Sequence, residues 1–153
     1  MTDPADHVRY MRMALEIAEQ AGLQGNLGIG SVIVRDGQVI GRGSNKMRTA
    51  KSPLVHAETD AIADACRSLD TDTLTGSTLY TTMEPCAMCA GAMLNANIRT
   101  WVMGGRLKAV GRTDLGQYSA ETFVDFMAAD VEIVTGILPE ECQAMRNRFY
   151  RPS

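Results

Sequence analysis

The sequence has no basic excess and no long apolar run, and only a few cysteines. Lys and Arg (15) are outnumbered by Asp and Glu (18), which gives a formal net charge of −3 at pH 7. Dedicated nucleic-acid-binding domains usually have a strong basic excess, so the charge argues weakly against that class. No apolar run approaches the length that spans a membrane. Residues 1–7 contain acids and a proline and no apolar core, so we expect no signal peptide and a cytoplasmic location.

The length of 153 residues and the hydrophobic content of 45% predict a globular protein with one domain spanning residues 1–153. A chain of this length buries roughly two thirds of its unfolded surface. The four cysteines are Cys66, Cys86, Cys89 and Cys142. Reduced thiols are expected in the cytoplasm, which argues against two disulfides. Cys86 and Cys89 are only three residues apart, a spacing that indicates metal or redox chemistry.

Hydrophobic spacing and turn signals predict strands that alternate with helices. Asp3-Pro4 starts a predicted helix that ends near Gly22, and Asp36-Gly37 predicts a hairpin. This order predicts an α/β fold, a three-layer α/β/α sandwich with a central mixed five-stranded sheet. The expected strands are 31–34, 39–41, 78–82, 100–104 and 131–135, and the later helices are 52–69, 85–95, 119–127 and 139–150.

Two short segments, His56-Ala57-Glu58 and Pro85-Cys86-Ala87-Met88-Cys89, contain residues with specific chemistry. Each lies at the predicted start of a helix. Imidazole and thiolate groups are good zinc ligands. Cys86 and Cys89 lie on one face of a helical turn, and the helix dipole at that end favours their ionised forms.

The number of ligands distinguishes a catalytic from a structural zinc site. A structural site needs four protein ligands, whereas His56, Cys86 and Cys89 are three. The open fourth position suits a water molecule, whose pKa zinc lowers to about 7. We expect Cys66 and Cys142 to be core thiols and His7 to be a surface or helix-packing residue. The pattern favours one catalytic zinc ion per chain.

Glu58, two residues after His56, could reach the metal-bound water without binding the metal. A carboxylate in that position can take a proton from water and return it to a substrate. Alone, Cys-x-x-Cys is often a redox pair or half of a structural zinc site. A structural zinc module that binds a partner is therefore a remote alternative, but it would need a fourth ligand and would not need Glu58.

Two stretches, Thr78 to Met93 (TLYTTMEPCAMCAGAM) and Gly41 to Asn45 (GRGSN), resemble the cytidine-deaminase-like superfamily. The match is to its short-chain branch of cytosine, guanine and tRNA adenosine deaminases. A His-x-Glu followed by Pro-Cys-x-x-Cys is the signature of zinc-dependent base deaminases. The resemblance covers nearly the whole chain and implies a cytidine deaminase-like fold and hydrolytic loss of an exocyclic amino group.

The resemblance also implies roles for individual residues. Zinc would be bound by His56, Cys86 and Cys89, and protons would be shuttled by Glu58. The substrate ring would be contacted by the side chain of Asn45, the N–H groups of Ala57 and Cys86, and the carbonyl of Glu84. Preorganised dipoles of this kind stabilise a tetrahedral centre.

The substrate is left open by the resemblance. The tail 131–151 resembles the tRNA branch, whereas residues 105–118 depart from the small-residue segment usual there, and Ser44 replaces a usual Trp. A free base needs no phosphate contacts, so we favour a free nucleobase, cytosine-like first and guanine next, with the tRNA wobble adenosine as the alternative. Cations that could touch phosphates are Arg42, Lys46, Arg48, Lys51, Arg99, Arg106, Lys108 and Arg112.

We also expect a homodimer with the helix at 85–95 near its interface. The grounds are the family resemblance and the small residues Ala87, Ala90, Gly91 and Ala92, which allow close packing. The same residues could equally pack against the protein's own sheet.

Overall fold

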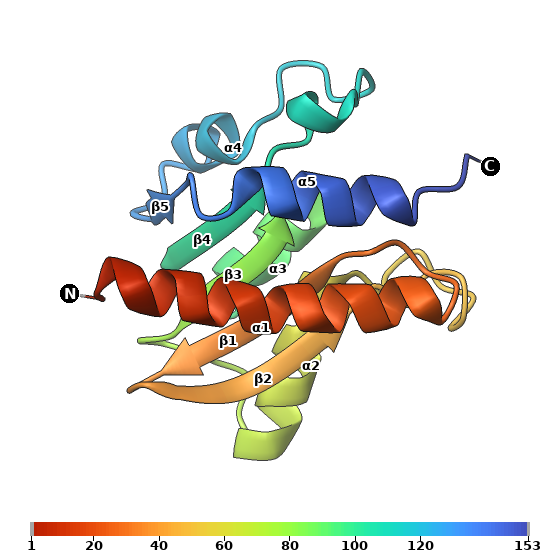
Figure 1. Ribbon diagram of the computed structural model, residues 1–153. Coiled ribbons are helices and arrows are strands. Elements are labelled where there is room, and N and C mark those ends of the chain that lie inside the picture. Colours follow the sequence, from red (N-terminus) through yellow and green to blue (C-terminus); the bar gives the residue numbers. More distant parts are fainter. Residues whose placement is uncertain (1, 153) are drawn as a thin grey trace.

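The computed structural model describes residues 2–152, and within that range strands and helices alternate as the sequence predicts (Figure 1). The elements are α1 (Pro4–Leu23), β1 (Gly30–Arg35), β2 (Gln38–Ser44), α2 (Ala57–Leu69), β3 (Thr78–Met83), α3 (Ala87–Asn95), β4 (Thr100–Gly105), the 3-10 helix η1 (Lys108–Val110), α4 (Ala120–Phe126), β5 (Glu132–Val134) and α5 (Pro139–Arg148).

The strands form one mixed sheet in the order β2-β1-β3-β4-β5. β1 pairs antiparallel with β2 and with β3, whereas β3–β4 and β4–β5 are parallel. The end of β2, the start of β1 and the ends of β3 and β4 therefore lie at one edge of the sheet. The expected mixed five-stranded sheet is confirmed.

Helices cover both faces of the sheet, and side chains that alternate along each strand separate the two cores. α1 and α5 lie side by side across one face (Figure 1), where Val32, Tyr80 and Val102 are buried. On the other face, Leu79 and Trp101 pack with residues of α2, α3 and α4. This is the predicted three-layer sandwich. No helix within residues 2–152 is long and apolar enough to cross a membrane.

The predicted helix at 52–69 starts later in the structure, at Ala57. Ser52-Pro53 resembles a helix start, but the N-cap residue is His56, whose N–H donates to Thr59 Oγ1 at 3.0 Å. The hydroxyl of Thr59 in turn donates to the carbonyl of Leu54 at 2.6 Å. The correction matters because it places His56 at the helix end itself.

The other predicted boundaries differ by a few residues. β2 runs on to Ser44 rather than ending at Gly41, α3 starts at Ala87 rather than Pro85, and the terminal helix ends at Arg148 rather than Tyr150. The extension of β2 has a packing reason. A Cβ atom at Gly43 would overlap the carbonyl of Ala57, so this glycine lets the first turn of α2 lie directly on β2.

Residues expected outside the zinc site are found in packing positions. Cys142 is buried in the core beneath α1 and α5, and Cys66 is partly buried against the opposite core. His7 packs against Tyr80, with its Nδ1 2.9 Å from the tyrosine hydroxyl. Ala90 is buried in the chain's own core, while Ala87 is exposed. The homodimer stays a prediction, which light scattering can check.

Candidate active site

A cavity of about 260 Å³ lies at the sheet edge where β2, β3 and β4 end. Its walls come from the α1–β1 connection, the loop after β2, the first turn of α2 and the loops after β3 and β4. It contains most of the residues that the sequence singles out. The lining residues are Leu27, Ile29, Asn45, Met47, His56, Ala57, Glu58, Met83, Glu84, Cys86, Leu107 and Arg112.

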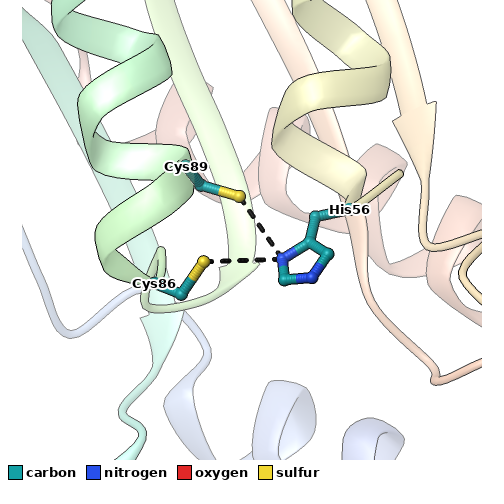
Figure 2. A group of neighbouring side chains, drawn as sticks. All are labelled: His56, Cys86 and Cys89. Atoms are coloured by element: carbon teal, nitrogen blue, oxygen red, sulfur yellow. Dashed lines mark hydrogen bonds between the residues drawn. The ribbon is translucent and has the colours of Figure 1, made fainter. Parts of the chain in front are cut away.

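The three predicted zinc ligands meet at this edge (Figure 2). His56 Nδ1 lies 3.5 Å from Cys86 Sγ and 3.4 Å from Cys89 Sγ. A tetrahedral zinc ion with ordinary Zn–N and Zn–S bonds separates nitrogen from sulfur by about 3.6 Å. Within residues 2–152, no fourth Cys, His, Asp or Glu joins this group. The donor set therefore fits a zinc ion with three protein ligands.

Helix ends hold these ligands in place. His56 is the N-cap residue of α2, and Cys86 is the N-cap residue of α3, with Cys89 in the first turn. Hydrogen bonding from Cys89 and from His56 lowers the pKa of the Cys86 thiol to about 4. Hydrogen bonding to Cys86 raises the pKa of Cys89, since that thiol is the donor. Zinc binding needs both sulfurs as thiolates, so it would release the proton that Cys89 shares with Cys86.

Glu58 lines the cavity beside His56 and is only 3% exposed. Its Oε1 accepts a hydrogen bond from the Thr81 hydroxyl at 2.8 Å. Burial raises the pKa of the Glu58 carboxyl because it disfavours the charged form. A carboxylate whose pKa is raised is a stronger base, which suits it to take a proton from water.

Asn45 lies at the end of β2, lines the cavity and is 3% exposed. Its Oδ1 accepts from Met47 N at 3.2 Å, which leaves the amide nitrogen as a donor. The strand end is fixed to α2 by Asp60, which accepts from Ser44 N at 3.1 Å and from Lys46 Nζ at 2.7 Å. Asn45 is therefore both a turn residue and a lining residue.

The resemblance implies a role for the backbone carbonyl of Glu84, and the structure shows that the side chain also has partners that no local sequence pattern predicts. The carboxylate pairs with Arg106, with Oε1 3.0 Å from Nε. It also accepts from the backbone N–H groups of Leu107 and Ala120, at 3.1 and 2.8 Å.

Two further residues at or near the cavity, Asn26 and Arg112, were not predicted from the sequence to shape it. Buried Asn26 fixes the loop after β2, since its Oδ1 accepts from Arg48 N at 3.1 Å and Thr49 N at 3.2 Å. Arg112 lines the cavity on the side of the loop after β4. The sequence gives Arg112 only as one of eight cations that could touch phosphates, and no local pattern signals the contact made by Asn26.

Comparison with known proteins decides the family. A profile of the cytidine and deoxycytidylate deaminase zinc-binding region matches residues 4–105. The chain belongs to this family. The deaminase is 37% identical over 144 residues to the tRNA-specific adenosine deaminase of Bacillus subtilis, which covers 93% of this chain and 87% of that relative.

Two solved structures extend the comparison. One, from a study of A-to-I editing by tRNA:A34 deaminases, has a TM-score of 0.78 and 32% identity and covers 90% of this deaminase and 98% of that chain. The guanine deaminase of Bacillus subtilis has a TM-score of 0.65 and 31% identity, and the match covers 70% of this chain and 69% of that chain.

Family membership and the ligand geometry agree that the protein is a zinc-dependent deaminase whose zinc ligands are His56, Cys86 and Cys89. When bound, the ion activates a water molecule as the nucleophile. The structural zinc module, which would need a fourth protein ligand, has no support among the described residues.

Proposed function

We propose that this deaminase converts an adenosine of tRNA, at the wobble position, to inosine. Water replaces the exocyclic amino group, and ammonia leaves. The observation that supports this most is the near full-length similarity to tRNA-specific adenosine deaminases. A second such relative, from Agrobacterium fabrum, is 34% identical over 147 residues and covers 96% of this chain and 95% of its own length.

In the proposed reaction, Glu58 takes one proton from the attacking water and delivers it to the ring nitrogen. It then takes the proton of the added hydroxyl group and delivers it to the amine, so that the C=O bond forms as the C–N bond breaks and ammonia leaves. Asn45 donates to the ring through its amide nitrogen. The N–H groups of Ala57 and Cys86 face the oxygen, and the Glu84 carbonyl accepts from the amine. Donors that are already in place stabilise the developing charge without reorganisation.

The cations near the cavity suit a polynucleotide. Arg112 lines the cavity itself. Arg48 follows the lining residue Met47, and its side chain donates to the carbonyl of Arg151 at 2.8 Å. Phosphate contacts supply most of the affinity for nucleic acids, so a local cluster can act despite the net charge of −3.

A free base is the second candidate. The departure of residues 105–118 from the small-residue segment favours it, as does the 31% identity to a guanine deaminase. The cytosine-like ring expected first from the sequence has less support than the tRNA alternative.

The test is ammonia release from free bases, nucleosides and a tRNA anticodon stem-loop. We expect the stem-loop to react with the highest kcat/KM and Arg112→Gln to reduce that value about tenfold, as for loss of one phosphate contact. Arg12→Gln is the control, since Arg12 pairs with Glu141 on the far surface of α1 and α5. Preference for a free base, with no stem-loop activity, would refute the proposal.

A further inference from the structure

The Glu84 carboxylate is nearly inaccessible to solvent and has four hydrogen bonds. Oε1 accepts from Arg106 Nε at 3.0 Å and from Leu107 N at 3.1 Å. Oε2 accepts from Ala120 N at 2.8 Å and from Arg106 Nη2 at 3.4 Å. The side chain is 4% exposed, so these bonds replace its hydration.

The same carboxylate binds both ends of the segment 107–120, which carries Arg112 to the cavity. Arg106 adds a further link between the two ends of this segment, because its Nη1 also donates to Glu121 Oε1 at 2.7 Å. From inside the segment, the Tyr118 hydroxyl donates to the carbonyl of Pro85. One carboxylate and one hydroxyl thus join the segment to the loop after β3.

That loop leads directly to a zinc ligand. Glu84 N donates to the carbonyl of Gly105 at 2.8 Å, Pro85 receives the Tyr118 contact, and Cys86 follows. Glu84 and Pro85, the two residues between β3 and Cys86, are therefore held by the end of β4 and by the segment that follows it. A buried ion pair is weak evidence for stability, because apolar residues of similar volume often serve as well, so what distinguishes this network is the set of positions that it fixes.

We propose that Glu84 is a positioning residue which, with Tyr118, fixes Cys86 for zinc binding and ties the segment 107–120 to the metal site. This rests on the zinc site alone and is independent of the substrate. Groups that orient metal ligands typically change metal affinity 10–100-fold when they are removed.

The experiment measures the zinc dissociation constant of the full chain by chelator competition. We expect Glu84→Gln to raise it 10–100-fold, because the amide NH₂ would face the N–H of Ala120. Tyr118→Phe removes only the hydroxyl and should raise it by a smaller factor. Leu15→Ala is a control for lost stability, since Leu15 lies in the core on the opposite face of the sheet. It should leave zinc affinity within twofold while lowering the unfolding temperature.

Two results would overturn the proposal. One is zinc affinity within twofold of the parent in both Glu84→Gln and Tyr118→Phe. The other is an equal loss of affinity in Leu15→Ala, which would mean that general stability alone governs binding. Should Glu84→Gln not fold, Tyr118→Phe decides, since the hydroxyl is at the edge of the network. Ammonia release plays no part, so the substrate proposal and this one can fail separately.

Discussion

The first turn of α2 and the loop after β3 each bury one glutamate, yet the two surroundings differ. Glu58 is 3% exposed and Glu84 is 5% exposed, so burial alone does not separate them. The Thr81 hydroxyl is the side-chain donor to Glu58, whereas Glu84 receives two bonds from Arg106 and two from backbone N–H groups. A carboxylate with few hydrogen bonds can gain and lose a proton, which suits proton transfer to a substrate. A carboxylate whose oxygens are fully hydrogen-bonded is better suited to hold neighbouring segments in place.

The strongest test of this contrast is Glu58→Gln. Gln keeps the shape but cannot take a proton, so we expect kcat to fall by about 10³–10⁴-fold with little change in KM. Zinc content, measured by elemental analysis, should stay at about one ion per chain. A variant with full zinc and kcat within tenfold of the parent would remove Glu58 as the proton shuttle.

Arg106→Gln tests the structural role of the Glu84 carboxylate. This change leaves the buried Glu84 carboxylate without its cation, and we expect a loss of about 2–4 kcal/mol in the free energy of unfolding, measured by urea denaturation. We expect a value near the lower end of this range, about 2 kcal/mol, because the Arg106 side chain is 30% exposed and solvent weakens the ion pair. Arg12→Gln, which breaks an exposed pair with Glu141, should cost less than about 1 kcal/mol. Equal losses in the two variants would contradict the assignment.

Thr81→Val sharpens the contrast by removing the hydroxyl donor from Glu58. Burial raises the pKa of Glu58 and the Thr81 hydrogen bond lowers it, so the variant should have a still higher pKa. Because the ionised form is the base, the acid limb of the kcat/KM profile should move to higher pH, with a smaller loss than in Glu58→Gln. Thr78→Val, at the start of the same strand, is the matched control. An unchanged acid limb would exclude this coupling.

The smallest effect concerns Glu121, the outer partner of Arg106. Hydrogen bonding from Arg106 lowers the pKa of the Glu121 carboxyl. The stability it contributes is therefore present above the pKa of the unfolded chain and is lost as pH falls through the folded value. Glu121→Gln should cost up to about 1 kcal/mol at pH 7 and nearly nothing in strong acid, by urea denaturation at both pH values. A loss that does not depend on pH would argue for packing instead.

The sequence revealed most of the fold and the metal ligands because both depend on local patterns. The Asp36-Gly37 turn is readable within two residues, and His56, Cys86 and Cys89 stand at helix ends. The start of α2 was misplaced because Pro53 resembles a first helical residue, while Thr59 fixes the true N-cap.

What could not be predicted depends on contacts between distant segments. Asn26 reaches Arg48, and Glu84 reaches Ala120, across sequence separations on which no local pattern reports. The side chain of Glu84 was overlooked for a further reason. The family resemblance implies a role for the backbone carbonyl of Glu84 and none for its carboxylate.

The closure of residues 107–120 by one carboxylate has a consequence for engineering. Because Leu107 and Ala120 are both bound to Glu84, the residues between them form a cassette with fixed ends. We expect that the length and sequence of this segment, Arg112 included, can be exchanged while Cys86 keeps its place, provided that Tyr118 or an equivalent donor is retained. Replacing the segment between Leu107 and Ala120 is therefore a way to test whether its residues decide which ring enters the cavity, without changing the metal ligands.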